Sequence, residues 1–279
     1  MWAFQDLLVI VNDAAHCSTL VDAAVRVAHR DGARLVGVYV EEPHGIPAYA
    51  QVELATGLGA RTPVGAFGTR HPEPPRDPHE WAHTVFHRRT TSAGIPAEWR
   101  VRYGDPAAIA VEHARYSDLV LLGQAEAGQA GPLVTPVLLG GGRPILVVPA
   151  VGNFPTLGER VVIAWNGSQE ATRAVHDALP LLRAATDVTV LTLHGGASDG
   201  AMGMDLARHL ACHGIHAEAT AYSIGDGAVA ALLLSRLADL QADLLVMGGY
   251  GHSRMREIVL GGVTREILQA MTVPTLLSH

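Results

Sequence analysis

The sequence is poor in residues that mark several classes of protein. It has only two cysteines in 279 residues, Cys17 and Cys212, and they form no closely spaced pair. This spacing argues against a framework of structural disulfides. Aromatic residues make up 5% of the chain, and no basic patch stands out against a formal net charge of -7. The composition therefore argues against nucleic acid as a partner.

Long apolar runs are also missing. No stretch approaches the roughly 20 residues that cross a bilayer. The first residues, MWAFQDLLVIVND, carry no basic segment and reach Asn12 and Asp13 early, which is unlike a signal peptide. Hydrophobic residues still make up 48% of the chain, enough for a core. We expect a cytoplasmic protein with no membrane contact, built as one large domain or two of ordinary size.

The first half alternates apolar runs with helical patterns. A helix is expected from about Ser18 to Arg30. Asp105 followed by Pro106 predicts an N-cap and a first helical residue. Strand, helix and strand in this rhythm predict a parallel sheet with right-handed crossovers. The predicted strands are residues 7–11, 33–40, 97–103, 118–123 and 144–148.

A proline-rich stretch near residues 43–78 interrupts this rhythm. It includes the tract HPEPPRDP, which cannot continue a helix. We expect a loop insertion there and the greatest mobility in the chain, because the stretch offers few periodic apolar positions.

Two groups of histidines invite a metal-binding interpretation. His79, His83 and His87 fall at helical spacing, which stacks three imidazoles on one face as a zinc site needs. A solvated polar face is the simpler interpretation, because no carboxylate or cysteine joins them at an obvious spacing. The simpler interpretation also applies to His209, Cys212 and His213. We therefore assign no metal ligand, and the role of the histidine-rich helix stays open.

The second half of the sequence repeats the first. Val161–Ser168 matches Leu8–Ala14, which aligns Asn166 with Asn12. Further matches align Gly248 with Gly123 and Pro274 with Pro144. Self-similarity on this scale indicates duplicated domains. We place them at residues 1–150 and 158–279, with the proline-rich insertion in the first.

A glycine-rich stretch, MGGYGHSRMREIVLGGVTREIL, follows the apolar run ADLLV of the second half. Its glycines are Gly248, Gly251, Gly261 and Gly262. Glycine allows close backbone approach and positive φ, which we expect at Gly251. Free N–H groups at a helix start favour an anion. The stretch predicts a phosphate cradle, although it matches neither a Walker loop nor a dinucleotide fingerprint. The other interpretation is that these glycines only form turns and bind no ligand.

This spacing resembles the Gly-x2-Gly-x9-Gly-Ser/Thr signature of nucleotide-binding universal stress proteins, and with the repeat the whole chain resembles their tandem form. Two positions depart from the family pattern: Gly262 replaces Ser or Thr, and Asn166 replaces Asp. Thr264 still offers a hydroxyl. The resemblance implies an α/β fold of two tandem flavodoxin-like or Rossmann-like domains of the adenine nucleotide alpha hydrolase type. Each would be a five-stranded parallel sheet with flanking helices, and the two would dock as a pseudo-two-fold dimer.

In this winding, strands one and four of a domain flank a topological switch point, where ligands bind. Asn166 and Gly248 follow those strands. The resemblance adds adenine near Leu193, ribose near Asn166 and Gly248, and phosphates on the glycine stretch. The nucleotide-binding candidates are Ala164, Asn166, Leu193, Met247, Gly248, Gly251, His252, Gly261, Gly262, Val263 and Thr264.

The first half has Glu126 where the second glycine should be. A carboxylate there would repel phosphate, so we expect no nucleotide in that half.

The leading hypothesis is thus a regulatory stress-response protein that binds ATP, with or without Mg²⁺, in its C-terminal half. We assign no catalytic residue, and any ATPase activity should be slow. The alternative is a nucleotide-free interaction scaffold, which the departures at Asn166 and Gly262 favour. An enzyme that uses the histidine-rich helix and a metal has little support. A protein partner is expected but not identified, and a further homodimer is left open.

The last strand of each half should cover the open sheet edge of the other half. Residues 144–148 and 274–278 are short and apolar, and each begins with a proline. A sheet edge leaves backbone groups unpaired, and proline is tolerated at a strand start. Antiparallel pairing of the two strands would cover both edges around an approximate two-fold axis.

Overall fold

The structure, a computed structural model, describes residues 3–11, 17–41, 77–124, 132–194, 201–224, 229–251 and 262–279. Nearly all of the predicted insertion lies outside these ranges, and so do Asn12, Glu126, His252 and Gly261.

Five strands and four helices build the described part of the first half. In chain order they are β1 (Asp6–Val11), α1 (Cys17–Asp31), β2 (Arg34–Glu41), α3 (Pro78–Ser92), β3 (Ala97–Tyr103), α4 (Pro106–Ala114), β4 (Leu119–Gly123), α5 (Val134–Gly140) and β5 (Ile145–Val148). All five predicted strands are confirmed, with ends that shift by one residue at most.

The described elements of the second half follow the same order as those of the first, with a short helix, α7, added after α6. Its elements are β6 (Arg160–Ala164), α6 (Gln169–Asp177), α7 (Leu179–Ala184), β7 (Asp187–His194), α8 (Ala201–Cys212), β8 (Glu218–Ser223), α9 (Val229–Asp239), β9 (Leu244–Gly248), α10 (Gly262–Ala270) and β10 (Thr275–Ser278).

Side-chain caps fix where several helices begin. The Asp105 carboxylate accepts a hydrogen bond from the Ala108 N–H at 3.0 Å, and Pro106 is the first residue of α4, as predicted. The Ser168 hydroxyl accepts from the Ala171 N–H at 3.1 Å and so begins α6. Each cap satisfies a backbone donor that the helix itself cannot pair.

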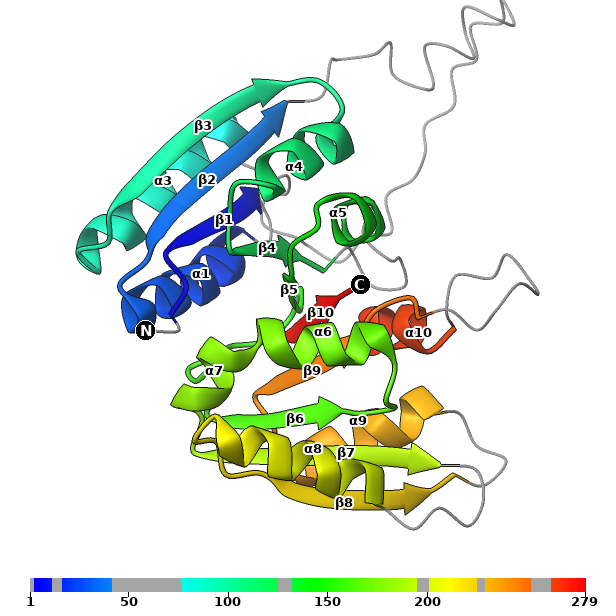
Figure 1. Ribbon diagram of the computed structural model, residues 1–279. Helices are drawn as coiled ribbons and strands as arrows, with labels where there is room; N and C mark the ends of the chain where they lie inside the picture. Colours follow the sequence, from blue (N-terminus) through cyan, green and yellow to red (C-terminus); the bar gives the residue numbers. More distant parts are fainter. Residues whose placement is uncertain are drawn as a thin grey trace, which may run out of the picture.

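The strands form a single ten-stranded sheet in the order β3-β2-β1-β4-β5-β10-β9-β6-β7-β8 (Figure 1). Strands within each half are parallel, whereas β5 and β10 pair antiparallel, with Val147 opposite Thr275 and Leu146 opposite Leu276. The predicted pairing of the two last strands is confirmed. Each half therefore repeats one winding, and the halves meet edge to edge at the centre of the sheet.

The core has two layers, one on each face of the sheet. Helices α1, α3, α6, α7 and α8 pack on one face, and α4, α5, α9 and α10 pack on the other. At the junction, Leu146 and Leu276 join the first layer while Val147 and Leu277 join the second. All four side chains are fully buried, so both layers run through the boundary between the halves.

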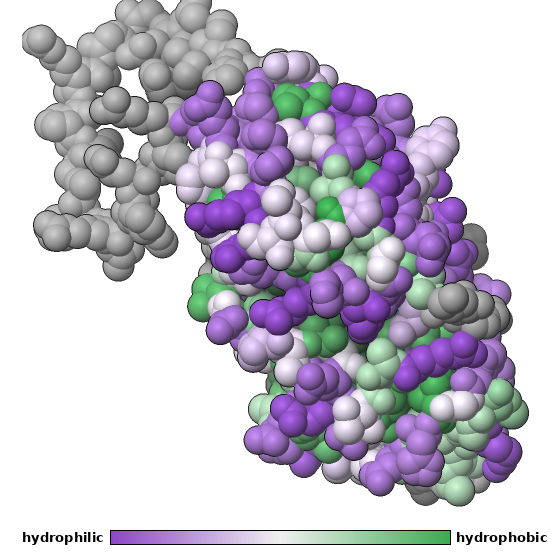
Figure 2. Space-filling model, turned by 90° about the vertical axis from the view of Figure 1, so that its left-hand side faces the viewer, coloured by the Kyte–Doolittle hydropathy of each residue, from purple (hydrophilic) through white to green (hydrophobic). Residues whose placement is uncertain are grey.

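Among the described residues, the exposed large hydrophobic side chains come from several separate segments, for example Tyr103, Leu139 and Val151. Figure 2 shows hydrophilic and hydrophobic residues mixed over one face of the molecule. Among the helices that the structure describes, none combines the length and apolar character needed to cross a membrane.

Candidate functional site

The candidate site lies where the chain leaves β6 and β9. These two strands are neighbours, with Ala164 opposite Met247. The helix after β6, α6, packs on one face of the sheet, and the helix after β9, α10, packs on the other. Helices that diverge from adjacent parallel strands open a crevice at the carboxyl ends of those strands. The sequence predicted this switch point, and the fold contains it.

A cavity of about 440 Å³ occupies this crevice. Nine of the eleven predicted binding residues line it, and the other two, His252 and Gly261, lie outside the described residues. The nine are Ala164, Asn166, Leu193, Met247, Gly248, Gly251, Gly262, Val263 and Thr264. The sequence pattern thus named residues that the fold brings together from three strands, a turn and a helix.

Six further lining residues were missed from the sequence. They supply an apolar wall and additional polar groups: Trp165, Ser168, Glu170, Leu191, Val229 and Leu233. Leu191 comes from β7, Val229 and Leu233 come from α9, and Trp165 directly follows β6. The part of Leu191 in the cavity depends on the pairing of β7 with β6, which sets it opposite Ala164.

The Asn166 side chain has a fixed orientation. Its Oδ1 accepts a hydrogen bond from the Ser168 N–H at 3.1 Å, which closes a tight turn before α6. Because the oxygen is engaged in this turn, the amide NH₂ is the part of Asn166 best suited to donate to a ligand hydroxyl.

Gly248 is required by packing rather than by ligand approach. A Cβ at this position would lie 2.5 Å from the Ala171 nitrogen and 2.7 Å from the Glu170 carbonyl carbon. Both are backbone atoms of α6, which cannot give way cheaply. The glycine therefore lets the start of α6 sit directly on the end of β9.

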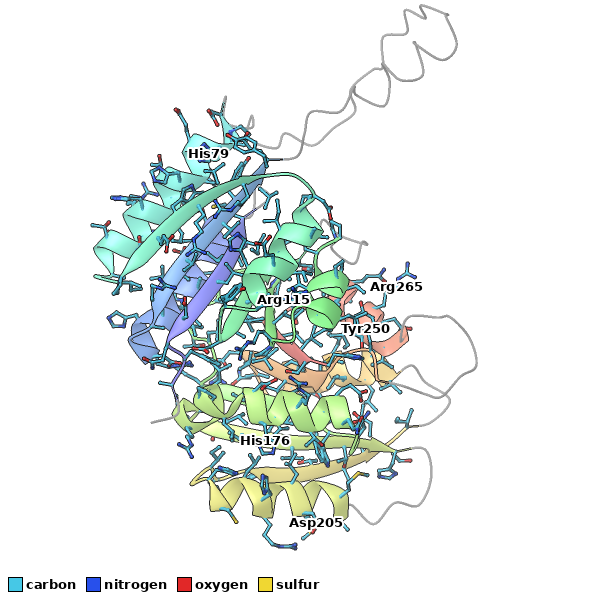
Figure 3. All side chains as sticks on the ribbon, turned by 45° about the horizontal axis from the view of Figure 1, so that its top comes forward. His79, Arg115, His176, Asp205, Tyr250 and Arg265 are labelled. Carbon is cyan, nitrogen blue, oxygen red and sulfur yellow. The ribbon has the colours of Figure 1, made fainter. Side chains whose placement is uncertain are left out.

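The turn after β9 is held by Tyr250, which no motif in the sequence marks. Tyr250 has φ 53°, whereas Gly251 is not among the residues with positive φ, so the expected left-handed residue was placed one position too late. The Tyr250 N–H donates to the Thr264 hydroxyl at 3.3 Å. Its own hydroxyl lies 2.8 Å from the hydroxyl of Thr135, in α5 of the first half. Figure 3 labels Tyr250 beside α10.

A buried carboxylate lies beside the glycine turn. Glu170 is 6% exposed and lines the cavity. Its Oε2 would lie 3.0 Å from a Cβ at Gly251, so glycine leaves room for this side chain. A carboxylate so close to a predicted phosphate site is unexpected, because like charges repel.

In the first half, the residue that directly follows the fourth strand contacts the other half of the molecule. Gln124 directly follows β4, and its side-chain NH₂ donates to the Leu268 carbonyl of α10 at 2.8 Å. Its Oε1 accepts from the Ala150 N–H at 3.0 Å. Gln124 thus ties the end of one domain to the last helix of the other.

The histidines of α3 pack against aromatic side chains. The Trp99 indole N–H donates to His79 Nε2 at 3.3 Å. Ring centres of His79 and His83 are 6.4 Å apart, and those of His83 and His87 are 6.0 Å apart. Over the residues that the structure describes, no group of three or more His, Cys, Asp or Glu side chains could hold a metal ion.

Residues 158–279 match the Universal stress protein family. The match covers the second half of the chain, which contains the candidate site. No curated protein sequence matches the chain.

Solved structures extend the likeness in fold to the whole chain. A universal stress protein from Archaeoglobus fulgidus DSM 4304 superposes with a TM-score of 0.69 at 16% identity, over 98% of this chain and 97% of that one. A functionally unknown protein from Pseudomonas aeruginosa PAO1 gives 0.62 at 15% identity, over 99% and 92% of the two chains. The expected fold of two tandem adenine nucleotide alpha hydrolase-like domains is confirmed.

Proposed function

We propose that the universal stress protein domain in the second half binds ATP and that the chain acts as a regulatory protein in a stress response. The observation that carries the proposal is the composition of one cavity. An apolar wall, a glycine turn and the first residues of α10 all face the same space. These are the surfaces that a purine, a backbone-bound phosphate and an anion at a helix start require.

The base and sugar have matching surfaces. Leu191 and Leu193 of β7 and Val229 and Leu233 of α9 all line the cavity, and this apolar lining suits adenine. Asn166 lies where the ribose would follow, and its NH₂ group can donate to a ribose hydroxyl.

The phosphates would lie on the glycine turn and the start of α10. Gly251, Gly262 and Val263 offer backbone close to the cavity. Thr264 is 5% exposed, and its oxygen already accepts the Tyr250 N–H, so its role is to hold the turn against the helix. The first backbone N–H groups of α10 lack partners within the helix and favour an anion.

Glu170 is the reason to include Mg²⁺ in the proposal. It is the only carboxylate among the described residues that line the cavity. Oxygen ligands from one carboxylate and from phosphates are a typical Mg²⁺ set, and the cation would offset the repulsion between Glu170 and phosphate. The two hydroxyls of that lining are engaged in local structure, since Ser168 caps α6 and Thr264 accepts from Tyr250, and no histidine is among its described residues. We therefore propose binding with at most slow hydrolysis.

The first half is proposed to be a second domain of the same type, residues 1–150, without a nucleotide. Its Glu126 replaces a cradle glycine, and Gln124 is committed to the contact with α10. We also propose a cytoplasmic location and an adenine nucleotide and a protein as partners.

A nucleotide-free interaction scaffold is the second candidate. The observation that favours it is the Asn166 oxygen, which already accepts from the Ser168 N–H, so that the side chain has less acceptor capacity left for a ribose hydroxyl than an aspartate would have. Denaturing the purified protein and identifying any released nucleotide separates this candidate from the first.

Titration calorimetry with ATP and Mg²⁺ tests the proposal directly. The full chain should bind one ATP, and Gly251→Val should abolish binding, because its side chain would meet Glu170 and fill the cavity. Unchanged thermal unfolding of the variant would show that the loss is local. Two equivalent sites in the wild type, or wild-type affinity in Gly251→Val, would overturn the assignment.

A further inference from the structure

Two elements of the second half hold the backbone of the turn that follows β9. The Gly249 N–H donates to the Ser278 carbonyl at 2.9 Å, and a ring nitrogen of His279 lies 3.1 Å from the Gly249 carbonyl oxygen. The Tyr250 N–H donates to the Thr264 hydroxyl at 3.3 Å. The end of β10 and the start of α10 thus each hold one residue of the turn.

A third contact to the same turn comes from the first half of the chain. The Tyr250 hydroxyl lies 2.8 Å from the hydroxyl of Thr135, the second residue of α5. Tyr250 is 9% exposed and belongs to the same core layer as Leu138 of α5. A Cβ on Gly249 would lie 2.6 Å from Leu138 Cδ2, so α5, green in Figure 1, lies directly against the turn.

Tyr250 needs these contacts because of its backbone conformation. Its φ of 53° is left-handed, which is unfavourable for a residue that carries a side chain. Such a residue persists only where its surroundings hold it. The next residue, Gly251, lines the cavity, and so does Thr264, which accepts the Tyr250 N–H. The conformation of Tyr250 therefore sets where the backbone that faces the ligand lies.

The repeat does not supply this hydroxyl pair a second time. The register of the two fourth strands aligns Tyr250 with Ala125, and the register of the two last strands aligns Thr135 with Arg265. Alanine has no hydroxyl to offer. The pair therefore joins the halves in one direction, from the half that contains the cavity to the half that we propose to be without nucleotide.

We propose that Thr135 is a positioning residue for the nucleotide turn. Its hydroxyl holds Tyr250 in the left-handed conformation that places Gly251 at the cavity. The inference rests on the proposed binding of nucleotide in the second half. Coupling between two sites is reciprocal, so a nucleotide on the turn strengthens the contact between Tyr250 and α5 in return. The first half thus senses the nucleotide of the second.

Titration calorimetry of the full chain with ATP and Mg²⁺ tests the positioning role. Thr135→Val keeps the shape of the side chain but removes the hydroxyl, and it should weaken binding about fivefold, the usual worth of one hydrogen bond. Thr135→Ser keeps the hydroxyl and should bind as the wild type does. The matched control is Thr90→Val, because the Thr90 hydroxyl donates within α3, to the Phe86 carbonyl. Its loss should lower stability without altering the affinity.

A double-variant cycle separates positioning from a general loss of stability. Tyr250→Phe removes the other partner and should weaken binding by a similar factor. Thr135→Val combined with Tyr250→Phe should bind no more weakly than either single variant, because all three lack the same hydrogen bond. Independent structural damage would instead make the two factors multiply.

Hydrogen exchange measures the coupling in the reverse direction. Saturating ATP should slow exchange in α5 more than in α3, which packs on the other face of the sheet. The excess in α5 should disappear in Tyr250→Phe at saturating ATP.

The possible failures can be told apart. Wild-type affinity in Thr135→Val, or multiplied losses in the double variant, would overturn the positioning role and leave the nucleotide site in place. Equal slowing of exchange in α5 and α3 would overturn the coupling to the first half. Absence of ATP binding by the wild-type chain would overturn the proposed function, and this inference with it.

Discussion

The fourth strand of each half ends in a glycine, but the two glycines have different surroundings. A Cβ on Gly123, at the end of β4, would find its nearest neighbour 3.9 Å away, at the flexible end of Leu20. A Cβ on Gly248, at the end of β9, would collide with the backbone of α6 at 2.5 Å. The helix after the first strand is thus pressed more tightly onto the sheet in the half that lines the cavity.

The residue after each glycine also differs. Gln124 sends its side chain to α10 of the other half. Gly249 instead lies against Leu138, whose Cδ2 would be 2.6 Å from a Cβ there. Both switch points contact the opposite half, one through a long side chain and the other through bare backbone. Duplicated positions can therefore keep a place in the fold while the chemistry around them changes.

The largest effect is expected where the halves are joined. Leu276→Lys places an ammonium in the middle of the central strand pair, where the wild-type side chain is fully buried. An unpaired buried charge costs about 3–5 kcal/mol, so the free energy of unfolding should fall by that amount. Denaturant unfolding measures the loss, and X-ray scattering shows whether the halves separate.

The exposed Val151, in the linker, gives a control, since Val151→Lys should leave stability unchanged. Wild-type stability in Leu276→Lys would mean that the halves do not join through β5 and β10.

The two strand-end glycines allow a paired test. Gly248→Ala should lower the free energy of unfolding by about 1–3 kcal/mol, because the methyl group overpacks against the α6 backbone. Gly123→Ala should change it by less than about 0.5 kcal/mol, because the site has room. Denaturant unfolding of both variants measures the difference. Equal losses would contradict the asymmetry between the halves.

The asparagines aligned by the repeat allow a comparison of ligand binding. Asn166→Ala should weaken ATP binding about fivefold, which corresponds to one hydrogen bond of about 1 kcal/mol. Asn12→Ala, at the matching position in the sequence, should have no effect. Calorimetry measures both. A loss in Asn12→Ala would place nucleotide in the first half as well.

The smallest effect concerns pH. The pKa of His213 is lowered in the folded protein, so unfolding takes up a proton between that value and the unfolded value near 6.5. Stability from this group is therefore complete above pH 6.5 and is lost as the pH falls through the lowered pKa. Thermal unfolding from pH 7.5 to 5 should show a flatter profile for His213→Ala than for the wild type. An unchanged profile would mean that the pKa of His213 is not lowered in the folded protein.

Much of this fold could be predicted because its signals are local. Apolar runs defined the strands, Asp105 with Pro106 defined a helix start, and the repeat showed that the strand winding occurs twice. The candidate site was partly predictable for the same reason, since Asn166 and Gly248 directly follow their strands.

The remaining site residues depend on contacts between segments far apart in the sequence. Glu170 looks like an ordinary residue in a first helical turn, and only the close packing of α6 on Gly248 buries it beside Gly251. The link from Tyr250 to Thr135 exists only because the two halves dock. The rings of His176 and His209 lie 5.5 Å apart only because α6 and α8 cover the same face of the sheet. No periodicity or spacing in the sequence could reveal these three contacts.

The antiparallel pair β5–β10 also sets a problem for synthesis of the chain. Strand β10 follows β5 by about 130 residues, which a ribosome makes in roughly ten seconds. During that interval the completed first half has an open sheet edge at Ile145–Val148. These four residues are buried in the finished molecule, and their backbone groups on that edge await the pairing with β10. Such an edge can recruit the same strand of another nascent chain. A crowded polysome would therefore favour domain-swapped chains, and slow dilute expression would favour the correctly closed molecule.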